Sequence, residues 1–524
     1  MNVGSIKFPN GGRFKFDPEK KDYFSTTNHS VRGRFVGNRF GVYAGGLRPN
    51  LEVEKIDLGK IMEKHGSLLN YLRSTGNITN GEDPKVIGVF FAGGPAPSAN
   101  AVFYGITMEA YRRGMRVLAF EDGCEGILKG KGVMLTPHNV WGIHRQGDVL
   151  IGTSRKNPSA KEREQIKNFL DKLGVSGLIG IGGDDTNTTL VRLGEMGIPV
   201  IGVPKTIDND LPKTDITFGH TTVIEASSRE LSSLINDARS RNAIYIAKVM
   251  GRTSGSWTIS AGMAAGATRT IIGEEYSKEG ILQLMGAHKK YSALDPVLRD
   301  ICEVIRVNGE KVSSPEDLKE RLQGKDSNPQ LTINLDALAG QIKELIDQRA
   351  TKGYHYALIT VAEGLADKLQ TEVTERDGEN KPIKGIISGI GTGIAYDEFG
   401  NPRLSDVKIA DILVKRVKQS TKATILAAPD TGYQYRSEEV PASFDINLSQ
   451  GLGVEAITMA AVGDFGKMVR IKDNDISSVN FSDLPRDPDT GHIIPRVVRL
   501  DKFPYIYAKT MEYAKKFEDD PSKP

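Results

Sequence analysis

Residues 175–185 read VSGLIGIGGDD, an apolar run that ends in two glycines and two aspartates. A short apolar run bounded by glycine is typical of a strand that is buried on both faces of a parallel sheet. The residues that follow, TNTTLVRLGEMG (186–197), have apolar side chains at helical spacing, and IPVIGVPKT (198–206) is apolar again. The stretch therefore predicts a strand, a helix and a second strand, with a glycine loop at the carboxyl end of the first strand.

The same alternation recurs on both sides of this unit. Upstream, KVIGVFFAGG (85–94), SANAVFYGITMEAYRRG (98–114) and RVLAFEDG (116–123) again predict strand, helix and strand. Downstream, apolar runs that end in polar loops occur at IYIAKVMG (244–251), TRTIIGEE (268–275) and YALITVAEG (356–364). Alternating strands and helices predict an α/β protein with mostly parallel sheets, whose ligands bind outside the carboxyl ends of the strands.

Composition excludes several classes of protein. The chain has 524 residues, of which 39% are hydrophobic and 26% are charged, as in a globular protein of more than one domain. The net charge of +3 comes from dispersed basic residues, which argues against a nucleic-acid partner. Two separate cysteines, Cys124 and Cys302, make a disulfide framework or a zinc site unexpected. Because the sequence has no long apolar run and no signal peptide, we expect a cytoplasmic protein without a membrane span.

Changes in composition and in the pattern of apolar residues along the chain suggest domain boundaries. The first residues are mixed in composition, with one amphipathic helical stretch near 61–73, and SSPEDLKERL predicts a helix capped by Ser314 with Pro315 at its first position. The predicted parts are an N-terminal extension (1–84), a first α/β domain (85–222) to which 440–470 returns, a second α/β domain (223–439) with a helical insertion (277–332), and a C-terminal segment (471–524).

Two glycine pairs are candidate phosphate sites. Gly93 and Gly94 end one predicted strand, and Gly182 and Gly183 end another. Glycine lets backbone amides approach a phosphate that a Cβ atom would keep away. Neither pair fits the patterns of a P-loop or a dinucleotide site, and a tight turn without a ligand explains each pair taken alone. Asp184, directly after the second pair, is a candidate ligand for Mg²⁺.

Charged residues follow other strands of the same unit. Arg155 in GTSRKNP can direct its guanidinium at phosphate oxygens, although an isolated surface arginine is the simpler interpretation. VPKTIDND (203–210) combines a lysine, a threonine and aspartates in one strand exit. A carboxylate here could accept the proton of a sugar hydroxyl, and Lys205 could neutralise charge on a transferring phosphate. The alternative is a turn whose Asp and Asn side chains bond to their own backbone.

The ordered set GGDD, PKTIDND, VMGR, VAEG and GYQYR resembles the phosphofructokinase family, and specifically the branch that uses pyrophosphate instead of ATP. The resemblance extends from about Lys85 to about Arg470. It implies two similar doubly wound domains with the active site in the cleft between them, the first (85–222) binding the phosphate donor and the second (223–439) binding the sugar phosphate. It also implies Mg²⁺ as cofactor, and a homo-oligomer, dimer or tetramer, whose active sites are shared between subunits.

The resemblance assigns a role to each matching residue. Asp208 matches the general base for the 1-hydroxyl of fructose 6-phosphate, and Asp184 matches the carboxylate that binds Mg²⁺. The donor contacts are Gly93 and Arg155, joined by the loop glycines Gly94 and Gly183. The contacts to the sugar phosphate and the transferring phosphoryl group are Thr206, Asp210, Met250, Gly251, Arg252, Glu363, Tyr433 and Arg436.

Asp185 is the residue that points to the donor, because ATP-using relatives have glycine at that position. A carboxylate there would oppose the α-phosphate of a nucleotide, whereas pyrophosphate ends before that point. Asp185 also suits a helix N-terminus, where an acidic side chain complements the helix dipole, and the two interpretations are compatible. Relatives have glycine in place of Ser98, and we expect the serine to narrow the donor pocket.

The expected reaction is reversible transfer from pyrophosphate to fructose 6-phosphate, which releases phosphate and serves glycolysis or gluconeogenesis. An ATP-dependent enzyme of the same fold, or one that takes sedoheptulose 7-phosphate, is the alternative. A regulatory subunit without turnover is disfavoured because Asp208 is present.

Overall fold

The computed structural model describes residues 55–79, 81, 83–324, 329–376, 382–388, 390–396, 402–438 and 440–518, and four short strands nearer the N-terminus. The chain divides into two compact units, Met1–Val53 and Glu54–Pro524. In the first unit β1 (Ile6–Lys7) pairs with β2 (Arg13–Phe14), and β3 (Asn38–Tyr43) pairs with β4 (Gly46–Leu51), both antiparallel. Most of residues 1–54 of the predicted extension lies outside the described residues.

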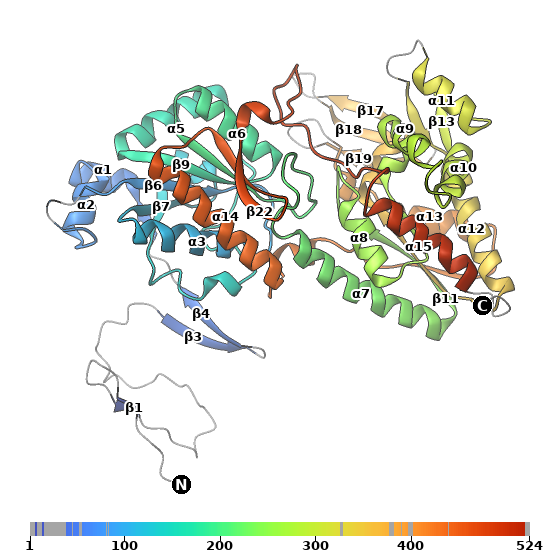
Figure 1. The fold of residues 1–524 in the computed structure, drawn as a ribbon, viewed down its shortest axis with the longest axis horizontal. Helices are drawn as coiled ribbons and strands as arrows, with labels where there is room; N and C mark the ends of the chain where they lie inside the picture. Colours follow the sequence, from blue (N-terminus) through green and yellow to red (C-terminus); the bar gives the residue numbers. More distant parts are fainter. Residues whose placement is uncertain are drawn as a thin grey trace, which may run out of the picture. The chain divides into compact units, whose positions relative to one another are not determined.

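The second unit begins with a lobe built on an eight-stranded sheet, in the order β22-β21-β10-β9-β6-β7-β8-β5 (Figure 1). The five central strands are parallel to one another: β21 (Lys467–Lys472), β10 (Val200–Pro204), β9 (Val175–Gly182), β6 (Val86–Phe91) and β7 (Arg116–Phe120). The strands at the two ends of the sheet pair antiparallel with their neighbours: β22 (Asp475–Asn480) at one end, and β8 (Lys131–Leu135) and β5 (Ile56–Asp57) at the other. β6 and β9 are the strands predicted from the two apolar runs that end in glycine pairs.

Helices cover both faces of this sheet. One face carries α1 (Leu58–His65), α2 (Leu68–Ser74), α4 (Cys124–Leu128), α5 (Ala160–Leu173) and α6 (Asp184–Glu195). The other carries α3 (Ala99–Arg112) and α14 (Ser443–Val462). These two helices pack closely because each has a glycine at the crossing. A Cβ atom on Gly105 would lie 2.4 Å from the carbonyl oxygen of Gln450, and one on Gly453 would lie 2.5 Å from that of Val102.

The second lobe contains a four-stranded parallel sheet in the order β12-β16-β11-β20. Its strands are β12 (Arg269–Ile271), β16 (Ala357–Ala362), β11 (Ala243–Val249) and β20 (Thr424–Ala427). The helices α7 (His220–Arg241) and α8 (Ser256–Ala265) pack on one face, and α12 (Leu335–Thr351) and α13 (Ile409–Lys418) pack on the other. The C-terminal helix α15 (Tyr505–Glu518) packs on α8.

The segment predicted as a helical insertion contains three helices, α9 (Lys278–Ala287), α10 (Leu294–Val304) and α11 (Pro315–Gln323). The predicted cap is confirmed, since the Ser314 side chain accepts a hydrogen bond from the amide of Asp317. The segment also holds a small antiparallel sheet that the sequence pattern did not predict, formed by β13 (Ile305–Val307), β14 (Glu310–Lys311) and β15 (Leu331–Ile333). A second small antiparallel sheet consists of β17 (Thr371–Arg376), β18 (Pro382–Ile387) and β19 (Thr392–Ala395).

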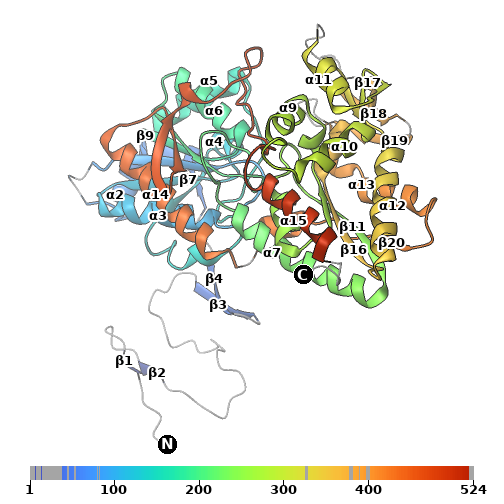
Figure 2. The same ribbon diagram turned by 45° about the vertical axis from the view of Figure 1, so that its right-hand side comes forward.

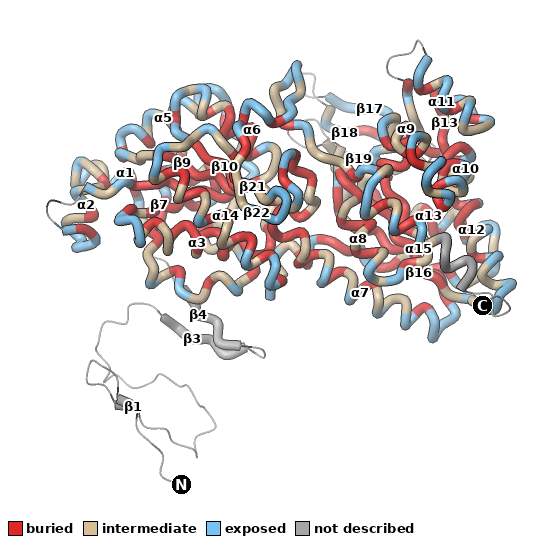
Figure 3. The backbone as a smooth tube through the Cα atoms, viewed as in Figure 1, coloured by how far each residue is buried: buried red, intermediate tan, exposed pale blue. Residues whose placement is uncertain are grey.

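Each lobe is organised around its own sheet, as the views in Figure 1 and Figure 2 show. The buried residues follow the central strands of both sheets and the inner faces of their helices (Figure 3). The predicted fold class, two α/β domains with mostly parallel sheets, is confirmed. Among the described helices, none combines the length and the apolar character that a membrane span requires.

Candidate active site

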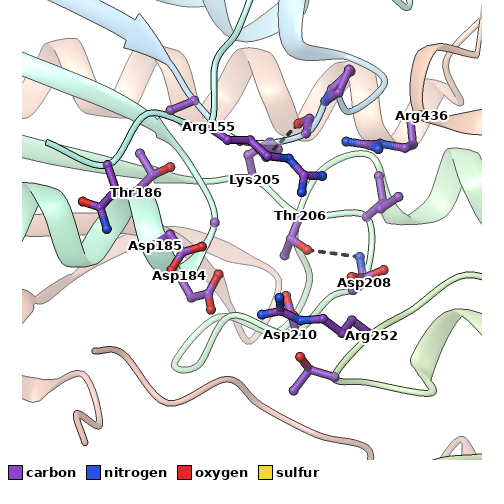
Figure 4. Close-up of a pocket in the computed structure, with 18 of the residues that line it drawn as sticks. Arg155, Asp184, Asp185, Thr186, Lys205, Thr206, Asp208, Asp210, Arg252 and Arg436 are labelled. Carbon is purple, nitrogen blue, oxygen red and sulfur yellow. Dashed lines mark hydrogen bonds between the residues drawn. The ribbon is translucent and has the colours of Figure 1, made fainter. Parts of the chain in front are cut away.

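A cavity of about 650 Å³ opens at the carboxyl ends of β6, β9 and β10 of the first lobe and of β11 and β16 of the second. This size is typical of a site for a small ligand. All but one of the residues predicted for the site line this cavity, the exception being Gly251. They are Gly93, Gly94, Arg155, Gly183, Asp184, Asp185, Lys205, Thr206, Asp208, Asp210, Met250, Arg252, Glu363, Tyr433 and Arg436 (Figure 4).

The first glycine pair forms a loop whose backbone is fixed by its neighbours. Gly93 has a φ of +87°, a conformation that favours glycine. Its amide donates to the carbonyl of Ser154 at 2.9 Å, and its carbonyl accepts from the hydroxyl of Thr153 at 2.7 Å. These bonds place Arg155, the next residue along that neighbouring strand end, on the cavity wall.

Lys205 leaves β10 and turns into the same loop. Its Nζ donates to the carbonyl of Gly94 at 2.8 Å and lies 5.3 Å from the ring centre of Phe91. Burial, together with the nearby Arg436 charge, lowers the pKa of Lys205 to about 8, while Asp184 acts in the opposite direction. The side chain is therefore a cation at neutral pH, held in a dry position where its charge acts strongly on an anion.

The second glycine pair leads directly into α6. A Cβ atom on Gly182 would lie 2.1 Å from Thr186 Oγ1, so the strand turns tightly into the helix at this point. The first turn of α6 thus brings its backbone amides and its positive dipole end to the cavity, where they favour an anion. Asp184 and Asp185 both lie on the wall. The Asp185 side chain is 55% exposed, and its Oδ1 lies 3.7 Å from Nδ1 of His492.

The loop after β10 carries two buried carboxylates. The Thr206 hydroxyl accepts from the amide of Asp208 at 3.1 Å, which fixes the turn between them. Burial and the charges of Asp210 and Glu363 raise the pKa of Asp208 well above its usual range. Burial and Asp184 also raise the pKa of Asp210, to about 6. Asp208 Oδ1 is buried and has no hydrogen-bond partner among the described residues, as suits an atom that accepts a proton from a substrate.

The second lobe supplies the opposite side of the cavity. The amide of Gly251, which has a φ of +138°, donates to Glu363 Oε2 at 3.1 Å. Gly251 therefore acts through its backbone and positions a carboxylate that does line the cavity. Burial raises the pKa of Glu363, so this side chain is partly protonated at a higher pH than an ordinary glutamate. The positive charge of Arg252 acts on both Asp208 and Glu363.

Tyr433 and Arg436 come from the loop after β20. Tyr433 is 62% exposed at the mouth of the cavity, and Arg436 Cζ lies 5.3 Å from the centre of its ring. Burial and the positive charge of Arg155 lower the pKa of Arg436. The two arginines thus converge on the cavity from different lobes, and an anion between them would relieve their repulsion.

The carboxylates suit a magnesium ion that arrives with phosphate. Mg²⁺ in proteins is usually held by one or two carboxylates, together with water and phosphate oxygens. The charge of Asp184 acts on Asp210 across the cavity. Within the described part of the chain, no three His, Cys, Asp or Glu residues gather to form a complete cage for a metal. Asp184, with Asp210 nearby, is the protein group that would hold Mg²⁺.

Some residues of the wall were not predicted. Lys156 and Asn157 follow Arg155 directly, and this neighbourhood could have suggested them. Tyr396, Arg403 and Ser405 belong to the segment after β19, which has no local sequence signal. The expectation that Ser98 narrows the donor pocket is wrong, because Ser98 is fully buried at the start of α3 and is not part of the wall. Its φ of 69° instead gives a physical reason for glycine at this position.

Comparison with known proteins gives a consistent set of relatives. A family model described as "Phosphofructokinase" matches residues 86–324. A pyrophosphate–fructose 6-phosphate 1-phosphotransferase of Thermotoga maritima is 30% identical over 455 residues, which is 83% of this chain and 92% of that protein. An ATP-dependent 6-phosphofructokinase of Mycobacterium bovis is 29% identical over 408 residues, 76% of this chain and 94% of that protein.

Among solved structures, a pyrophosphate-dependent phosphofructokinase from Marinobacter aquaeolei superposes with a TM-score of 0.51. It is 18% identical, and the match covers 79% of this chain and 86% of that one. At this identity the superposition concerns the fold alone.

Proposed function

Because the chain belongs to the phosphofructokinase family, we propose that it transfers a phosphoryl group from pyrophosphate to the 1-hydroxyl of fructose 6-phosphate. The products are fructose 1,6-bisphosphate and phosphate. Pyrophosphate and a phosphate ester have similar phosphoryl potentials, so the reaction runs in both directions. The cytoplasmic location of the protein and its assembly into a homo-oligomer remain predictions from the family resemblance.

The observation that carries the choice of donor is the pair of carboxylates at the start of α6. Asp184 and Asp185 both line the cavity at the helix end that attracts phosphate. Asp184 suits the metal that accompanies the donor phosphates. Asp185 adds a second negative charge on the same wall, and a nucleotide α-phosphate that extended past the metal-bound phosphates would meet it. Pyrophosphate has no such extension.

The transfer itself needs a base and a set of cations. Asp208 accepts the proton of the 1-hydroxyl as the oxygen attacks phosphorus, and the bond from phosphorus to the bridging oxygen of pyrophosphate breaks. Lys205 and Arg252 stabilise the charge that spreads over the transferring group, and Arg155 stabilises the departing phosphate. When bound at Asp184, Mg²⁺ would supply further neutralisation of the donor phosphates. Positioning and electrostatics thus provide most of the rate.

The acceptor lies on the side of the second lobe. Arg436 and Tyr433 at the mouth of the cavity suit the 6-phosphate, and the Glu363 carboxylate suits a sugar hydroxyl. Sedoheptulose 7-phosphate is a second acceptor candidate, because one added hydroxymethyl unit is difficult to exclude from an open polar site.

ATP is the second candidate donor. Relatives whose names give pyrophosphate and relatives whose names give ATP are almost equally similar to this chain, at 30% and 29% identity. The test is a comparison of initial rates with fructose 6-phosphate, Mg²⁺ and either pyrophosphate or ATP, coupled to detection of fructose 1,6-bisphosphate. We expect a clear preference for pyrophosphate, and turnover with ATP alone would contradict the proposal.

A further inference from the structure

The chain between β22 and α15 crosses from the first lobe to the second (Figure 1). Its backbone is bonded on both sides of the cavity. The amide of Ile493 donates to Thr188 Oγ1 of α6 at 3.1 Å, and the amide of Val498 donates to Glu274 Oε1 at 3.0 Å. The same Glu274 oxygen accepts from the amide of Gly255, in the loop that follows Arg252. We call residues 492–500 the crossing segment.

Arg496 lies in the middle of the crossing segment and faces the loop that follows β10. Its Nη2 donates to the carbonyl of Asn209 at 2.8 Å and to the Asn209 side-chain oxygen at 2.6 Å. Its Nε donates to the same carbonyl at 3.3 Å, and its Nη1 donates to the carbonyl of Thr214. Its backbone amide donates to the carbonyl of Asp210 at 2.5 Å. One residue thus satisfies carbonyls at both ends of a loop that contains two cavity carboxylates.

The loop turns at Asn209. This residue has a φ of +53°, in the left-handed region that asparagine adopts more often than most residues with a side chain. Asn209 lies between Asp208 and Asp210, so its backbone conformation determines where both carboxylates point. Its side-chain oxygen also accepts from the amide of Thr217 at 3.1 Å. Arg496 and Thr217 together hold Asn209 in this conformation.

The contacts of Arg496 are those of a positioning group. Among the described residues, no carboxylate lies within ion-pair distance of its guanidinium, which donates to backbone carbonyls and to the side-chain oxygen of Asn209. A planar guanidinium can bond to several oxygens of fixed spacing at once, which the point charge of a lysine cannot. The side chain does not line the cavity, so it acts on a substrate only through the loop.

We propose that Arg496 is a positioning residue for phosphoryl transfer, which fixes the direction of Asp208 and Asp210 through Asn209 and couples the catalytic loop to the crossing segment. This inference rests on the proposed role of Asp208, but it does not depend on which donor is used. A general base displaced by about 1 Å loses on the order of 10² in rate while substrate contacts elsewhere persist. The effect therefore falls on kcat rather than on KM.

The test compares Arg496→Ala with Arg499→Ala in the full-length protein. Arg499 lies three residues further along the crossing segment, and its side chain pairs with Asp501 at 2.7 Å and with no other carboxylate in the part of the chain that the structure describes. With the donor that supports turnover of the parent, R496A should lower kcat about 10²-fold, with KM for both substrates within about threefold of the parent. R499A should leave kcat unchanged. Which donor the enzyme uses is decided by the rates of the parent protein with pyrophosphate and with ATP. A failure of the pyrophosphate proposal is therefore distinguished from a failure of the proposal about Arg496.

Two further measurements separate positioning from a general loss of structure. Millimolar guanidinium chloride should restore part of the kcat of R496A and should have no such effect on R499A. Arg496→Lys should fold and should bind fructose 6-phosphate, as measured by calorimetry. Its kcat should still fall about tenfold, because the single ammonium group of lysine replaces a guanidinium that donates several hydrogen bonds at once. If R496A fails to fold, R496K carries the test. A kcat within threefold of the parent in the folded variant, or equal losses in R496A and R499A, would overturn the proposal.

Discussion

The guanidinium of Arg436 lies where a side chain on Gly94 would begin, since a Cβ atom on Gly94 would be only 1.8 Å from Arg436 Nη2. Gly94 belongs to the first lobe, and Arg436 follows a strand of the second. The absence of a side chain at position 94 therefore lets a cation from one lobe reach the loop formed by Gly93 and Gly94 in the other. The carbonyl of Gly94 also accepts from Lys205, so this position joins two of the cations of the cavity.

Gly94→Ala should consequently displace Arg436 and weaken the hold on the sugar phosphate. We expect KM for fructose 6-phosphate to rise about tenfold or more, because one charge-assisted contact of about 1.5–3 kcal/mol is disturbed. Gly340→Ala is the matched control, because Gly340 lies in α12 with nothing within 4 Å of the added methyl group. Steady-state kinetics with both variants check this, and an unchanged KM in G94A would show that Arg436 does not contact the acceptor.

Asp208→Asn should abolish most turnover while it keeps the shape of the loop. General-base catalysis contributes about 10²–10⁴ in rate, so kcat should fall by that factor. Binding of fructose 6-phosphate, measured by calorimetry, should stay within about threefold of the parent. In the parent, kcat/KM should rise with pH through a limb above the usual aspartate range, because burial, Asp210 and Glu363 raise the pKa of Asp208. A D208N variant with near-parental kcat would exclude Asp208 as the base.

The lowered pKa of Lys205 predicts how the activity depends on pH on the alkaline side. Its folded pKa of about 8 is below the ordinary lysine value, so the free enzyme loses this cation as the pH rises through about 8. We expect kcat/KM to fall over that range, and the limb of kcat to lie at higher pH because bound phosphate favours the charged lysine.

Two variants of Lys205 check this assignment. Lys205→Arg should shift the alkaline limb upward, because arginine stays protonated. Lys205→Met should lower kcat about 10²–10³-fold below the alkaline limb, where the parent lysine is charged, and the difference from the parent should shrink above it. Unchanged alkaline limbs in K205R would assign the titration to another group.

Asp185→Gly tests the basis of donor choice. If the carboxylate blocks a nucleotide, the variant should gain turnover with ATP while its rate with pyrophosphate falls. Asp185→Asn separates charge from size, since it keeps the side-chain volume and removes the repulsion. Glu195→Gln at the other end of α6 is the control, because Glu195 is exposed, pairs with Arg486 at 3.3 Å and does not line the cavity. No gain with ATP in either Asp185 variant would mean that donor choice is determined elsewhere.

A prediction about stability concerns the C-terminal helix. Lys509 is buried and pairs with Glu275 at 2.9 Å and with Glu512 at 3.1 Å. Lys509→Met would remove the cation that pairs with the buried Glu275 and the partly buried Glu512, at a cost of about 3–5 kcal/mol in the free energy of unfolding. Lys502→Met, at an exposed position before α15, should change the free energy of unfolding by less than about 0.5 kcal/mol. Chemical denaturation of both variants measures the difference, and equal midpoints would contradict a structural role for Lys509.

Much of the fold could be predicted because its signals are local. The runs at 85–94, 175–185 and 198–206 are mostly apolar and end in glycine, aspartate or a Lys-Thr pair, as buried parallel strands that lead into polar loops do. The small sheet β17–β19 could not be predicted in this way, since most of its residues are exposed and show no clean alternation. Its existence depends on pairing and on packing against the second lobe.

In the candidate site too, some residues have a local sequence signal that allows prediction and others have none. Lys205, Asp208 and Asp210 are close in sequence, and their spacing at the end of a strand predicts a site that combines a base with a cation. Arg496 contacts the same loop from almost 300 residues away, as the 287 positions between it and Asn209 show. Nothing near Arg496 in the sequence distinguishes it from a surface arginine, because its role arises only when the crossing segment passes between the lobes.

The most direct measurement of the central claim is the reverse reaction followed by phosphorus NMR. Purified protein would be incubated with fructose 1,6-bisphosphate, Mg²⁺ and inorganic phosphate, without any nucleotide. We predict a growing pyrophosphate resonance, matched by fructose 6-phosphate and absent in D208N. If the bisphosphate stays unchanged until ADP is added, and ATP then forms, the enzyme uses the nucleotide and pyrophosphate is not its donor.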